Sequence, residues 1–201
     1  MDKGRLEAFS DGVIAIIITI MVLELRASKE ATVEALRPVV PVFLSYLLSF
    51  VFVAIYWNNH HHLLQAADRV TGRVLWANTH LLFWLSLVPF VTHWLGGAFA
   101  PVPVAAYGTV LLLCGCAYYL LSRALVADHG PDSALAAAVG RDSKGIASLV
   151  IYASAVPLAF VEPWVSCGLY VVVAVMWLVP DRRIETTLAA RDPADSSPPP
   201  S

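Results

Sequence analysis

Three long stretches of this 201-residue chain contain almost no charged side chain. No Asp, Glu, Lys or Arg occurs between positions 37 and 68 or between positions 73 and 123, and Glu162 is the only one between positions 144 and 181. A helix needs about 20 apolar residues to cross the hydrocarbon core of a bilayer. Because hydrocarbon offers no partner to a free backbone N–H or C=O, each crossing must be helical. The sequence therefore predicts an all-α integral membrane protein.

The composition excludes several other classes. Only 14% of the residues are charged, against about 25% in soluble domains, and a net charge of -2 leaves no basic excess for nucleic acid. The three cysteines form no C-x-x-C pair, so neither a disulfide framework nor a zinc site is indicated. The chain has no phosphate-binding loop, dinucleotide fingerprint or catalytic triad arrangement. We expect no enzymatic activity, no metal and no cofactor.

Glycine and proline divide the apolar stretches. Residues 96–103 contain two of each and split the longest stretch into two helices, while Glu162 and Pro163 mark a turn in the last stretch. We expect six transmembrane helices, near residues 7–25, 39–57, 74–95, 103–122, 146–161 and 164–180. Residues 1–180 would form the transmembrane domain, and the Pro- and Ser-rich residues 181–201 a disordered cytoplasmic tail.

The positions of the Lys and Arg residues predict the orientation. Ten of the 13 fall on the side of the membrane that holds both chain ends, which places both termini in the cytoplasm. Tryptophans lie near the ends of the predicted spans, as in an interfacial aromatic belt: Trp57, Trp76, Trp94, Trp164 and Trp177.

The first predicted helix carries a carboxylate, Asp11, beside Ser10 near its cytoplasmic end. An ionisable group at this depth is a candidate functional residue, although it could instead hold the helix end in the headgroup layer. Its partners should lie at the same depth, at the end of the second helix and the start of the third. The polar residues there are Asn58, Asn59, His60, His61, His62, Trp76, Asn78 and His80.

One face of the same helix is an aliphatic stripe. At about 100° per residue, the stripe contains Arg5, Phe9, Gly12, Ile16, Ile20 and Leu23, with Thr19 at its border. Asp11 lies about 140° away from Ile16, so the carboxylate and the stripe face different neighbours. Such a face packs against lipid or against other helices, and the periodicity does not distinguish the two.

Arg5, Phe9, Ser10 and Asp11 match an Arg-x-x-x-Phe-Ser-Asp signature. In this motif the chain resembles the transmembrane protein 175 family, which are potassium-permeable channels of prokaryotes and of endosomes and lysosomes. The layout agrees, because the motif opens the first helix, six helices are expected, and a tryptophan and histidines close the second.

The resemblance implies a potassium-preferring homotetramer in the inner (plasma) membrane of a prokaryote, conducting passively through a pore lined by the first helices. Ile16, Ile20 and Leu23 would form its narrowest point, and Thr19 would be linked to selectivity. Arg5, Phe9, Ser10 and Asp11 would hold the helix in place. From its position alone, we add that Glu24 would place four carboxylates at the outer mouth and concentrate cations there.

Two other functions use the same residues. A proton-coupled carrier would use Asp11 with the histidine cluster of His60, His61 and His62. A membrane enzyme would need a metal held by these histidines, but adjacent residues on a helix point in different directions. The carrier is therefore the stronger alternative to a channel.

Overall fold

The computed structural model describes residues 2–26, 32–130, 133–139 and 142–178. Its helices are α1 (Lys3–Leu23), a 3-10 helix (Glu34–Leu36), α2 (Val39–Gln65), α3 (Gly72–Ser86), α4 (Val88–Gly97), α5 (Pro101–His129), α6 (Ala134–Val139), α7 (Ser143–Leu158) and α8 (Pro163–Leu178). The predicted cytoplasmic tail, residues 181–201, lies outside the described residues.

Four helical segments among the described residues are long and apolar enough to cross a membrane. They are Lys3–Leu23, Val39–Gln65, Gly72–Gly97 and Pro101–His129. The fifth and sixth predicted spans correspond to α7 and α8, which are apolar but only 16 residues long. At 1.5 Å per residue each is about 24 Å in length, short of the roughly 30 Å hydrocarbon core.

The helix boundaries differ from the predicted ones in two ways. The third span is broken at Leu87, because Pro89 in the first turn of α4 has no N–H to donate to the preceding turn. Helices α2 and α5 continue beyond the predicted spans, to Gln65 and His129. The histidine cluster therefore lies within α2.

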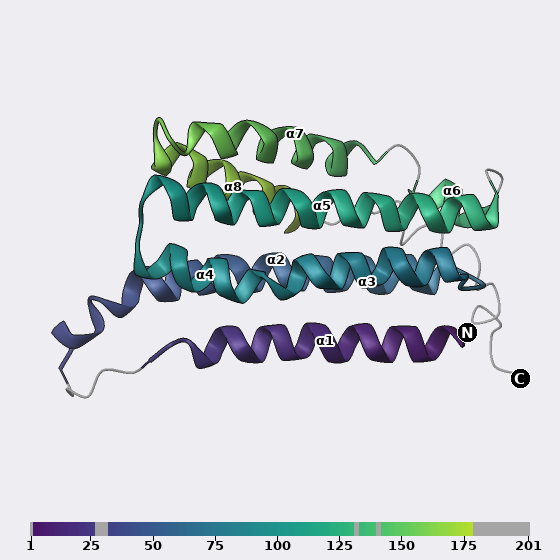
Figure 1. Ribbon diagram of the computed structural model, residues 1–201, viewed down its shortest axis with the longest axis horizontal. Coiled ribbons are helices and arrows are strands. Elements are labelled where there is room, and N and C mark those ends of the chain that lie inside the picture. Colours follow the sequence, from purple (N-terminus) through teal and green to yellow (C-terminus); the bar gives the residue numbers. More distant parts are fainter. Residues whose placement is uncertain (1, 27–31, 131–132, 140–141, 179–201) are drawn as a thin grey trace, which may run out of the picture.

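The helices form three layers (Figure 1). Helix α1 runs along one side of the bundle and packs against α2, α3 and α4. Helix α5 packs against α3 and α4 on one side and against α7 on the other. The start of α1 lies at the same end as the α2–α3 loop and the end of α5, whereas the end of α1 lies with the α4–α5 and α7–α8 turns. In a single chain, α1 therefore has neighbours on one side only.

Polar contacts link the inner helices at a few points. The hydroxyl groups of Ser49 and Tyr107 are 2.9 Å apart, and Thr92 donates a hydrogen bond of 2.6 Å to Ser49, which joins α2, α4 and α5. Interhelical hydrogen bonds in membranes average about 0.6 kcal/mol each. Gly108 lets α8 approach α5 closely, since a Cβ at this position would lie 2.6 Å from Cζ of Tyr170.

Candidate functional site on the first helix

Helix α1 begins at a side-chain cap and buries one narrow face. The carboxylate of Asp2 accepts a hydrogen bond of 3.1 Å from the backbone N–H of Gly4, which satisfies one of the free donors at the helix start. The buried residues recur every three or four positions, as a helix packed on one side requires. They are Leu6, Ser10, Ile14, Ile17 and Met21.

The opposite face of α1 exposes large apolar side chains. Their exposed fractions are 57% for Phe9, 59% for Ile16, 44% for Ile20 and 73% for Leu23. Arg5, Gly12 and Thr19 are exposed as well. The aliphatic stripe of the sequence is therefore the side of α1 that its own chain leaves uncovered, and a continuous apolar surface of this kind marks contact with lipid or with another chain.

Thr19 places a hydroxyl group on this exposed face. Its Oγ1 donates a hydrogen bond of 2.8 Å to the carbonyl of Ala15, one turn earlier in the same helix. The hydroxyl hydrogen is therefore used within α1, while the oxygen atom remains available on the exposed side as an acceptor.

Ser10 joins α1 to two other helices through a buried chain of hydrogen bonds. Nδ2 of Asn78 in α3 donates to Oγ of Ser10 at 2.9 Å, and Oγ donates to the carbonyl of Leu6 at 2.9 Å. Oδ1 of Asn78 lies 2.6 Å from Nε2 of His60 in α2, and because Oδ1 can only accept, Nε2 is the donor. Ser10 and Asn78 are completely buried and His60 is almost so. This chain holds the depth and the rotation of α1 against α2 and α3.

Asp11 has a different partner. Its Oδ1 accepts a hydrogen bond of 2.9 Å from the indole Nε1 of Trp57 in α2, and the Trp57 ring stacks on His61 with 5.8 Å between ring centroids. Sequence reasoning missed Trp57, because its position near a predicted span end favoured the aromatic belt. The signal that could have found it was the spacing from Trp57 to His61, one helical turn on the same face.

Several of the other expected partners of Asp11 make contacts of their own. Nε2 of His80 accepts a hydrogen bond of 2.8 Å from Nε1 of Trp84, one turn along α3. His62 makes an edge contact with His61, and Trp76 is 78% exposed. Within the part of the chain that the structure describes, no group of three or more His, Cys, Asp or Glu side chains could hold a metal ion.

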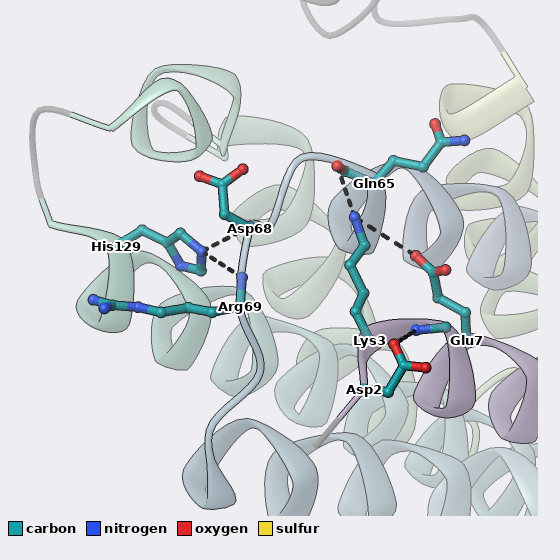
Figure 2. Close-up of polar contacts among 8 residues, drawn as sticks. Asp2, Lys3, Glu7, Gln65, Asp68, Arg69 and His129 are labelled. Atoms are coloured by element: carbon teal, nitrogen blue, oxygen red, sulfur yellow. Dashed lines mark hydrogen bonds and ion pairs between the residues drawn. The ribbon is translucent and has the colours of Figure 1, made fainter.

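Each end of α1 also carries a polar contact to a neighbouring segment. At the start, Nζ of Lys3 donates to the carbonyl of Gln65 at 3.1 Å and lies 3.9 Å from the carboxylate of Glu7 (Figure 2). At the end, the carboxylate of Glu24 lies 3.1 Å from Nδ1 of His93 in α4, and both side chains remain partly exposed. The polar contacts thus lie toward the two ends of α1, and the aliphatic face lies open between them.

The Arg-x-x-x-Phe-Ser-Asp motif is divided between these two faces. Ser10 and Asp11 bond to α2 and α3, whereas Arg5 and Phe9 lie on the exposed face. One half of the motif therefore positions α1, and the other half is presented outward.

Comparison with known proteins gives a consistent result. The family described as "Endosomal/lysosomal potassium channel TMEM175" matches residues 5–89, which include the motif and all of α1 to α3 after the first two residues. A protein of Chryseobacterium sp. (strain P1-3), named a potassium channel, is 49% identical over 189 residues, which cover 94% of this chain and 98% of that protein. The endosomal/lysosomal proton channel TMEM175 of Danio rerio is 28% identical over 132 residues, covering 63% of this chain and 24% of that protein.

A solved structure also resembles the fold. It is the crystal structure of a lysosomal potassium-selective channel TMEM175 homolog from Chamaesiphon minutus, with a TM-score of 0.75 and 29% identity, covering 88% of this chain and 96% of that one. The likeness therefore extends over nearly the whole length of both chains, and it agrees with the near-full-length match to the Chryseobacterium protein. This chain belongs to the TMEM175 family.

Proposed function

We propose that the protein is a potassium channel, a homotetramer whose four α1 helices surround a central pore. The observation that carries this proposal is the row of exposed side chains on α1, Phe9, Ile16, Ile20 and Leu23, on a helix whose other side is held by a buried polar network. The similarity to a bacterial protein named a potassium channel and to a solved potassium-selective channel supports the same function.

In this arrangement the exposed face of α1 turns toward the pore axis. Ile16, Ile20 and Leu23 from four subunits form successive hydrocarbon rings, and such rings gate a pore by dewetting. The oxygen of Thr19 lies between these rings and is the ligand that favours potassium. Arg5 and Phe9 lie at the cytoplasmic mouth, while Ser10 and Asp11 keep the face pointed inward.

The rest of the chain completes a six-helix subunit. Helices α7 and α8 form the last hairpin, and both termini lie in the cytoplasm of a prokaryotic cell with the protein in its plasma membrane. The surplus of Lys and Arg on that side supports this orientation. Glu24, at the outer end of α1, gives the outer mouth a ring of four carboxylates.

Potassium flux into liposomes tests the proposal. Ile16→Asn and Leu23→Asn should each raise the potassium leak of the purified protein, because a polar side chain relieves dewetting of the constriction. Val150→Asn is the matched control, since Val150 is as exposed as Ile16. Its helix, α7, lies on the opposite side of the bundle from α1 (Figure 1). The control variant should leave the flux unchanged.

Several results would contradict the proposal. Equal flux in the wild type, Ile16→Asn and Leu23→Asn would show that α1 does not line the pore. The mass of a single chain in native mass spectrometry would contradict the proposed homotetramer. A saturable flux that needs a proton gradient and gives no unitary current steps would favour the proton-coupled carrier instead.

A further inference from the structure

The loop between α2 and α3, residues 66–71, is bound to the last turn of α5. The backbone N–H groups of Asp68 and Arg69 both donate to Nε2 of His129, at 3.0 and 3.3 Å (Figure 2). The guanidinium of Arg69 donates to the carbonyl of Asp128, and Oγ1 of Thr71 donates to the carboxylate of Asp128. Two consecutive residues of α5 therefore hold three residues of the loop.

These contacts specify the protonation state of His129. Because Nε2 accepts two hydrogen bonds, it carries no hydrogen, and the single ring hydrogen lies on Nδ1. Nδ1 is 2.8 Å from the carbonyl of Leu125, to which it donates. A second proton would have to bind at Nε2, where it would face two N–H donors and remove the acceptor that both of them use. The bound loop thus requires a neutral imidazole.

The residue just before the loop contacts α1. The carbonyl of Gln65, the last residue of α2, accepts the hydrogen bond from Lys3 in the first turn of α1 (Figure 2). Helices α1 and α5 lie on opposite sides of the layer formed by α2, α3 and α4 (Figure 1), so Gln65 and the loop form a connection across this layer at the end of the bundle where α1 begins.

We infer that residues 65–71 form a proton-sensitive strap between α5 and α1, closed when His129 is neutral and released when it is protonated. Histidine is the side chain whose charge ordinarily changes between pH 5 and 8. Loss of the His129 acceptor frees the backbone of Asp68 and Arg69, while Asp128 still holds the side chains of Arg69 and Thr71. The end of α2 at Gln65, whose carbonyl holds Lys3, then loses the support of the loop, so the start of α1 loosens. The strap itself follows from the geometry, whereas its effect on conduction rests on the proposed function.

Charged side chains of both signs take part in the contacts next to His129. The carboxylate of Asp128 accepts from Thr71, and the guanidinium of Arg69 donates to the carbonyl of Asp128. The nearby helix α6 carries no charged residue.

Hydrogen–deuterium exchange of the loop tests the strap without any transport assay. The full-length protein in detergent is compared at pH 7.5 and 5.5 as wild type, His129→Gln and His129→Leu. The intrinsic exchange rate of the loop peptide is the same in all three proteins at one pH, so differences report the strap alone. Gln keeps a neutral oxygen acceptor that does not titrate, and Leu has no acceptor.

At pH 7.5 the wild type and His129→Gln should protect the loop equally, and His129→Leu should exchange about tenfold faster, as expected for two lost hydrogen bonds. At pH 5.5 the wild type should behave like His129→Leu, while His129→Gln remains protected. His80→Gln is the control, because His80 bonds only within α3 and should follow the wild type. Equal protection of the wild type and His129→Gln at both pH values would overturn the strap, and so would full protection in His129→Leu.

Potassium flux at two cytoplasmic pH values then tests the link to α1. The wild type should change its flux between pH 7.5 and 5.5, and His129→Gln should not. The loop exchange of the wild type could respond to pH while the flux changes equally in the wild type and in His129→Gln. That combination would refute the link to α1. No potassium flux in any variant would refute the proposed function. The hydrogen–deuterium exchange result alone would then show whether the strap exists.

Discussion

The buried chain of Ser10, Asn78 and His60 makes a quantitative prediction about how firmly α1 is held. Asn78→Leu keeps a similar volume but removes both contacts of the amide. His60 is then left with a buried donor and no acceptor, which costs about 1–3 kcal/mol. Ser10 keeps its bond to the Leu6 carbonyl. The loss of its bond from Asn78 therefore adds only about 0.6 kcal/mol to the cost, the average for an interhelical hydrogen bond in a membrane. We expect a destabilisation of about 2–3 kcal/mol.

Thermal unfolding of the purified protein in detergent, followed by tryptophan fluorescence, measures this effect. For a chain of this size 1 kcal/mol shifts Tm by about 2–4 °C, so Asn78→Leu should lower Tm by about 5–10 °C. Thr79→Val is the matched control, because the adjacent Thr79 is exposed and its hydroxyl bonds only to the carbonyl of Leu75 in the same helix. Its Tm should stay within about 1 °C of the wild type.

A double-mutant cycle separates this network from a general loss of packing. Because Ser10 and Asn78 share one hydrogen bond, Ser10→Ala combined with Asn78→Leu should lose less than the sum of the two single variants, by about 0.5 kcal/mol or more. An unchanged Tm in Asn78→Leu, or strict additivity with Ser10→Ala, would refute the argument that this network holds α1.

Two further predictions concern the outer mouth and the helix packing. Glu24→Gln should lower the single-channel potassium current at low ionic strength but not at high salt, where charges are screened. Glu162→Gln, in the α7–α8 turn at the same end of the bundle (Figure 1), should leave the current unchanged at both salt concentrations. Equal currents in both variants would contradict the proposed ring of carboxylates. Gly108→Ala should lower Tm by about 2–12 °C, because its Cβ would meet the ring of Tyr170 and overpacking costs about 1–3 kcal/mol. Gly168→Ala has nothing within 4 Å of its added Cβ and should leave Tm unchanged, so similar shifts in both would contradict this reading of Gly108.

The apolar helices and the grouping of side chains on one face of α1 could be predicted from the sequence. Absence of charge over long stretches is a strong signal, because a bilayer tolerates few ionised groups in its core. The period of the helix likewise gives the angular position of each side chain and groups Ile16, Ile20 and Leu23 on one face. That this face is exposed is seen only in the structure. The resemblance to the TMEM175 family is confirmed by relatives that match nearly the full length of the chain.

The choice of polar partners could not be predicted in the same way. Several polar side chains lie at the depth of Ser10 and Asp11, and periodicity does not say which of them meet. Asn78 bonds to Ser10, and Trp57, an amphipathic ring that suits an interface equally well, bonds to Asp11. The attachment of the α2–α3 loop to His129 was also out of reach, since it joins residues about sixty positions apart and follows α5 beyond its apolar stretch.

The distribution of contacts along α1 determines how this helix can move. Directional bonds lie toward its two ends, through Lys3, Ser10 and Asp11 at one and Glu24 at the other, whereas Ile14 and Ile17 in the middle belong to the hydrophobic core. Aliphatic contacts have no preferred angle, so they resist a small twist of the helix far less than the hydrogen bonds do. In the proposed pore, substitutions that alter the ease of opening should therefore concentrate at the extremities of α1, and those that alter conductance at its centre.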